Sequence, residues 1–74
     1  MNEMKITDLQ LAAYLTALDY PIVRVEGPSG RRAFVFADVP QDVVLTYYSG
    51  TDRISARKLF GAYRDLKGLT VQAL

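Results

Sequence analysis

Apolar side chains near the start of the chain recur at the spacing of an amphipathic helix. Their positions predict a helix over residues 8–18, with a main stripe of Leu11, Tyr14, Leu15 and Leu18. Thr7 is the expected N-cap, and Gln10 follows three residues later, as in a capping box. Pro21 should end the helix, because the residue before a proline is disfavoured in the α region. We expect residues 1–6 to be a loose lead-in to one domain over residues 7–74.

Two short apolar runs on either side of a glycine-rich turn predict a β-hairpin. The expected strands are residues 22–26 and 32–36, and the turn is Gly27-Pro28-Ser29-Gly30. Phe34 and Phe36 fall on one strand face together with Arg32. A hairpin alone is marginal in water. Its open edges could pair with another strand or with a second copy of the chain, so the sequence suggests a homodimer.

Residues 42–48 carry conflicting signals. Their valine, threonine and tyrosine side chains favour a strand by propensity. The flanking residues favour a short helix, because Asp38 and Gln41 have capping-box spacing, Pro40 suits a first turn and Gly50 suits a stop. We predict the helix.

The last segment predicts a longer helix over residues 55–67, with Ser55 as N-cap and Gly68 as stop. Residues 70–74 could extend it or fold back. Its inward stripe is Leu59, Ala62, Tyr63, Leu66 and Leu69. On the opposite side, Arg57, Gly61, Arg64 and Gly68 fall within about 60° of one another. An exposed helical glycine costs about 1 kcal/mol relative to alanine, and these two leave bare backbone between arginines, which suggests a contact surface.

Together these elements predict an α+β domain, with the three helices covering a small single-layer sheet. The chain has 74 residues, no cysteine and no histidine. Disulfides and Cys-based zinc sites are therefore excluded, and the commonest general base is absent. Ser55 and Lys58 have Ser-x-x-Lys spacing, but the serine is better explained as a helix cap. The acidic residues are scattered, so we expect no metal, no cofactor and no enzymatic activity.

The apolar runs are too short for a membrane-spanning helix. The start of the chain lacks a signal-peptide pattern. Together with the absence of cysteine, this favours a cytoplasmic protein.

Nucleic acid is the first candidate partner. The net charge of +1 is not that of a strong nucleic-acid binder, but it permits a local basic patch. Arginine suits bidentate phosphate contacts. The candidate phosphate contacts are Arg31, Arg32, Arg53, Arg57, Lys58, Arg64 and Lys67.

A protein partner or a second copy of the chain is the alternative. Tyrosines are enriched at interfaces, and Tyr48 cannot point inward together with Tyr47, because adjacent helical residues differ by about 100°. Ala13 and Ala17, flanked by Leu9, form a small-residue face on the first helix. That face predicts either close packing of a second helix within the chain or self-association.

Three stretches together resemble a known family. They are residues 7–18, residues 30–40, and Ser-Ala-Arg-Lys-Leu-Phe at 55–60 followed by Ala-Tyr-Arg-Asp-Leu-Lys at 62–67. They resemble a small family of uncharacterised domains from bacteria, archaea and their phages. The resemblance implies one intact domain and a phage or mobile-element origin, and it supplies no binding residues. Asp19 stands where the family would have a glycine that stops the first helix.

Overall fold

The computed structural model describes residues 2–28, 30–50 and 53–71. Its elements in chain order are β1 (Glu3–Ile6), α1 (Leu9–Ala17), β2 (Ile22–Glu26), β3 (Ala33–Ala37), α2 (Gln41–Ser49) and α3 (Ala56–Val71). Three helices accompany a three-stranded antiparallel sheet, so the predicted α+β class is confirmed.

The sheet contains one strand more than the predicted hairpin. The strand order is β1-β3-β2, so the prediction of a loose lead-in over residues 1–6 is wrong for Glu3–Ile6. Met4 pairs with Phe36 and Ile6 with Phe34. The four-residue run is too short to stand out by its alternation. It pairs with β3, which lies in the centre of the sheet and is buried on both faces. One edge that the hairpin alone would leave open is therefore covered from within the chain.

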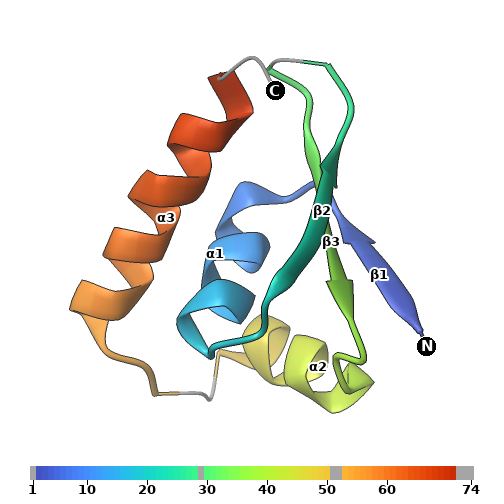
Figure 1. The fold of residues 1–74 in the computed structure, drawn as a ribbon. Helices are drawn as coiled ribbons and strands as arrows, with labels where there is room; N and C mark the ends of the chain where they lie inside the picture. Colours follow the sequence, from blue (N-terminus) through green and yellow to red (C-terminus); the bar gives the residue numbers. More distant parts are fainter. Residues whose placement is uncertain (1, 29, 51–52, 72–74) are drawn as a thin grey trace.

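The protein is built in layers, with α1 between the sheet and α3 and with α2 across one end of α1 (Figure 1). This central position explains why α1 is apolar on more than one side. Its residues Ala12, Ala13 and Leu15 are completely buried, and so is Phe36 of β3. Ala62 and Leu66 of α3 complete the core against α1.

The two ends of α1 are closed by local hydrogen bonds. Asp8, and not the predicted Thr7, is the N-cap, because its carboxylate accepts from the backbone N–H groups of Gln10 and Leu11. At the other end, the N–H of Tyr20 donates to the carbonyl of Leu15, as in a Schellman motif. Asp19 has φ 72°, the left-handed conformation that a glycine would adopt there without steric cost.

Replacing Asp19 by glycine is therefore expected to stabilise the domain by about 0.5–1 kcal/mol. A left-handed residue with a Cβ costs about 1–2 kcal/mol, and the greater freedom of glycine in the unfolded chain offsets part of the gain. The ion pair lost with Asp19, a 3.5 Å contact to Lys58, is exposed and contributes little. Urea denaturation gives the free energy of unfolding. Asp19→Ala is the control, because it removes the carboxylate but keeps the Cβ. A glycine variant no more stable than the alanine variant would contradict this account.

The short helix α2 forms where the flanking signals predicted it. Gly50 ends it with φ 72°. The predicted cap is wrong, because Pro40 occupies the cap position with no side-chain hydrogen bond. Asp38 instead ties the start of the chain to the end of β3. Its N–H donates to the carbonyl of Asn2 at 2.8 Å, and its carboxylate accepts from the N–H of Asn2 at 3.2 Å.

Helix α3 begins at the predicted cap, since the Ser55 hydroxyl accepts from the N–H of Lys58 at 3.3 Å. It continues through the predicted stop at Gly68 to Val71. Leu69 packs against the core and so favours continuation of the helix past the glycine. The carbonyl of Thr70 accepts from the N–H of Gly30 at 2.6 Å, which holds the hairpin tip against the end of α3.

Ion pairs cover the sheet face that lies away from the helices. Arg24 of β2 makes two hydrogen bonds, of 2.7 and 2.8 Å, to the carboxylate of Glu3 on β1. Its Nε also donates to Glu26 at 2.6 Å, and Lys5 lies 3.0 Å from Glu26. Because these pairs span β3, they cover Val35, which is only 1% exposed on this outer face. The charged groups of this face are thereby engaged with one another.

This cluster predicts a specific sensitivity to acid. Hydrogen bonds from Arg24 hold the pKa of Glu3 and of Glu26 below the ordinary value of 4.5. The stabilisation is present above about pH 4.5 and is lost as pH falls through the lowered values. Thermal melts from neutral to acid pH should show a smaller loss of stability in the double variant Glu3→Gln, Glu26→Gln than in the wild type. Parallel curves for the two proteins would contradict the assignment.

Candidate functional site

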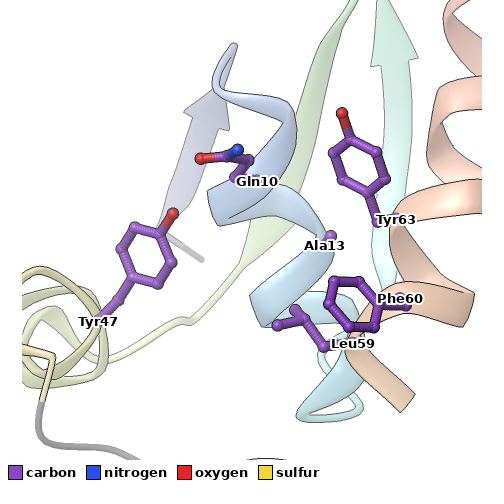
Figure 2. Close-up of a pocket in the computed structure, with 6 residues that line it drawn as sticks. All are labelled: Gln10, Ala13, Tyr47, Leu59, Phe60 and Tyr63. Atoms are coloured by element: carbon purple, nitrogen blue, oxygen red, sulfur yellow. The ribbon is translucent and has the colours of Figure 1, made fainter. Parts of the chain in front are cut away.

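A groove lies where the three helices meet, and we call it the helical groove. It has a volume of about 280 Å³. Figure 2 shows α1 as its floor, with Tyr47 of α2 on one side and Phe60 and Tyr63 of α3 on the other. Gln10 and Ala13 supply the floor, and Leu59 completes the lining. The surface is apolar apart from the Gln10 amide and the tyrosine hydroxyls.

An aromatic contact joins the α2 wall of the groove to α1. The ring of Tyr47 lies 5.0 Å from that of the buried Tyr14 and 5.1 Å from that of Tyr48, measured between ring centres. Burial raises the pKa of the Tyr47 hydroxyl above its ordinary value of 10.0, and the charge of Asp8 and the neighbouring Tyr48 add to the shift. The hydroxyl therefore stays protonated at neutral pH and can donate a hydrogen bond at the rim.

The α3 wall presents a large apolar side chain to solvent. Leu59 and Tyr63 are half-buried against the core, but Phe60 is 68% exposed. On α2, Leu45 and Tyr48 are 63% and 66% exposed. An exposed phenylalanine beside an apolar groove is typical of a contact surface. Phe60 was not predicted as a contact residue. Its position three residues after Arg57 and four before Arg64 places it on the same helix face as these arginines, which could have indicated its exposure.

The basic side chains of α3 form a ridge beside the groove, which we define as Arg57, Arg64 and Lys67. All three are exposed, as predicted. A Cβ atom built at Gly61 or Gly68 would meet no atom of the described residues within 4 Å, so a side chain at either position would not clash with them. Lys58 is exposed on another side of the helix, near Asp19.

The hairpin tip contributes less to a basic surface than predicted. Arg31 is exposed, but Arg32 is only 9% exposed, and its Nη1 donates to the carbonyl of Gly27 at 2.9 Å. Arg32 is thus a structural residue of the tip and is not available to phosphates. Arg31 lies near the end of α3, and the exposed Arg53 precedes its start. About 24 Å of helix separates the two ends of α3. The predicted cations therefore do not form one continuous patch, because Arg31 and Arg53 lie beyond opposite ends of the ridge.

The predicted self-association face is buried inside the chain. Ala13 is 0% and Ala17 is 4% exposed, because their small side chains lie in the core where α1 meets α3. Leu9 is half-buried against the core. Only Tyr48 of the predicted interface residues lies on the surface. The other prediction for this face, a second helix packed closely against it, is the one that the structure confirms.

Within the described part of the chain, no group of three or more acidic side chains could hold a metal ion. None of the helices described there is long and apolar enough to cross a membrane. No protein-family model, curated protein or solved structure matches this chain.

Proposed function

We propose that this domain is a non-catalytic binding module that captures a segment of a partner protein in the helical groove. The observation that carries the proposal is the exposure of Phe60, at 68%, beside a lining made almost wholly of apolar side chains. Covering such a surface releases about 25 cal/mol per Å² of apolar area. The cysteine-free composition and the family resemblance favour a cytoplasmic, phage-linked setting.

The packing of the groove walls supports this proposal. The floor is the central helix α1, and the ring of Tyr47 packs against that of Tyr14. Walls that are already formed lower the cost of ordering them when a partner binds. Tyrosine and phenylalanine supply large contact areas of the kind enriched at protein interfaces.

Nucleic-acid binding through the basic ridge is the second candidate. The observation in its favour is that Arg57 and Arg64 are exposed on the same helix face as the open glycines. Arg31 lies beyond one end of this face. Each phosphate contact would then add about one unit to the slope of log Kd against log salt concentration. The burial of Arg32 weakens this candidate, and so does the net charge of +1. It also leaves the apolar groove without a role.

The proposal is tested with a yeast-displayed library of random peptides of about 16 residues, or roughly four helical turns. The library is sorted with the wild-type domain and, in parallel, with Phe60→Ala. We expect enriched clones that bind the wild type and not the variant. Enrichment that is equal for both proteins, or no enrichment at all, would contradict capture by the groove. Binding of labelled oligothymidine that Arg57→Gln, Arg64→Gln abolishes would favour the second candidate.

A further inference from the structure

The basic ridge and the helical groove are adjacent, and we infer that together they select one kind of occupant: an acidic amphipathic helix of a partner protein. The inference rests on the proposed function and specifies its ligand. The apolar side of the helix would enter the groove, and carboxylates along one flank would reach the ridge.

The arrangement of α3 supports this inference. Phe60 is flanked by Arg57 one turn before it and by Arg64 and Lys67 one and two turns after it, so all four side chains lie toward one side of the helix. Asp65 is the one acidic residue in the sequence of α3 and lies about 140° around the helix from Phe60. The α3 rim of the groove is therefore positively charged and faces solvent.

The opposite rim has a different character. Tyr47 presents a protonated hydroxyl there, and Gln10 of the floor is uncharged. The acidic residue on that side is Asp8, which caps α1 and whose charge acts on the Tyr47 hydroxyl. The electrostatic asymmetry between the two rims would orient an occupant with its acidic flank toward α3 and would disfavour a basic segment.

The size of the groove fits side chains from a helix. Its volume of about 280 Å³ lies just below the range of roughly 300–1,000 Å³ for small-molecule sites. Helices that bind in grooves insert a few apolar anchors at i, i+3 or i+4, and i+7. Carboxylates at flanking positions could then pair with Arg57 and Arg64, whose guanidinium groups suit bidentate contacts.

The test uses two displayed libraries with the same apolar positions at helical spacing. In one library the flanking positions are Glu or Asp, and in the other they are Lys or Arg. The baits are the wild-type domain, Phe60→Ala, the double variant Arg57→Gln, Arg64→Gln, and Lys58→Gln. The last is a matched control, because Lys58 is a cation of the same helix about 160° from Phe60.

We expect the wild type to recover at least about tenfold more clones from the acidic library than from the basic one. The double variant should bind the acidic clones at least about tenfold more weakly, and Lys58→Gln should bind them within about twofold of the wild type. Raising salt from about 50 to about 300 mM should weaken the acidic clones in particular, which gives a readout that needs no variant.

Three outcomes would overturn the inference. Equal recovery from both libraries, with binding still lost in Phe60→Ala, would reject the acidic ligand and leave the groove proposal standing. No clones that depend on Phe60 would reject both. Self-association of the wild type that Phe60→Ala abolishes would assign the surface to a second copy of the chain.

Discussion

Replacing Phe36 by alanine is expected to leave most of the protein unfolded at 25 °C. Phe36 is completely buried in the central strand β3, where its backbone neighbours are Met4 of β1 and Ile22 of β2. Truncating a buried phenylalanine costs about 3–5 kcal/mol, because apolar contacts are lost and a cavity remains. A core of this size supplies about 3–5 kcal/mol of net stability. The loss therefore matches the whole stability of the domain.

Circular dichroism during urea denaturation measures this effect. The matched control is Val23→Ala, since Val23 also lies in the sheet but is 46% exposed at the irregular position of β2. The free energy of unfolding of Val23→Ala should stay within about 0.5 kcal/mol of the wild-type value. A Phe36→Ala protein with a cooperative transition and a midpoint close to that of the wild type would show that the sheet and α1 do not share one core.

Replacing Phe60 by alanine should have the opposite profile, with a large effect on binding and little on stability. Loss of a central aromatic anchor costs about 2 kcal/mol or more, which is roughly a thirtyfold rise in Kd. The free energy of unfolding should change by no more than about 0.5 kcal/mol, because the side chain is 68% exposed and alanine is a strong helix former. Fluorescence anisotropy with a peptide recovered by the wild type gives the Kd ratio.

Leu45→Ala is the control for this prediction. Leu45 is 63% exposed on α2 but does not line the helical groove. If exposed apolar area alone governed binding, both variants would weaken it equally. We expect Leu45→Ala to change the Kd by less than about threefold, and equal losses in the two variants would count against the groove as the binding site.

Much of the fold was predictable from local signals. The apolar stripe from Leu11 to Leu18 predicted α1. The stop signal at Gly50 correctly favoured a helix over a strand for α2. Strand β1 was missed because four residues alternate too briefly to stand out against an irregular chain start. It forms by pairing with β3 far along the chain, Met4 with Phe36 and Ile6 with Phe34. That pairing is tertiary and not local.

The site was predictable only in part. The exposed ridge on α3 followed from helical periodicity. The burial of Arg32 was indicated by alternation, which places it on the same strand face as Phe34 and Phe36, but its charge suggested a surface position. The buried guanidinium donates from Nη1 to the main-chain carbonyl of Gly27 at 2.9 Å, a partner that alternation does not indicate. The groove itself could not be predicted, because it is formed by three helices whose relative placement no periodicity encodes.

Binding in the helical groove is tested most directly by amide chemical-shift mapping of the isotope-labelled domain during titration with a peptide recovered by the wild type. We expect the largest shifts at the groove residues Ala13, Tyr47, Phe60 and Tyr63, and little change at Lys5 and Val35 on the outer sheet face. Largest shifts on the outer sheet face or at the hairpin tip would contradict a function based on the helical groove.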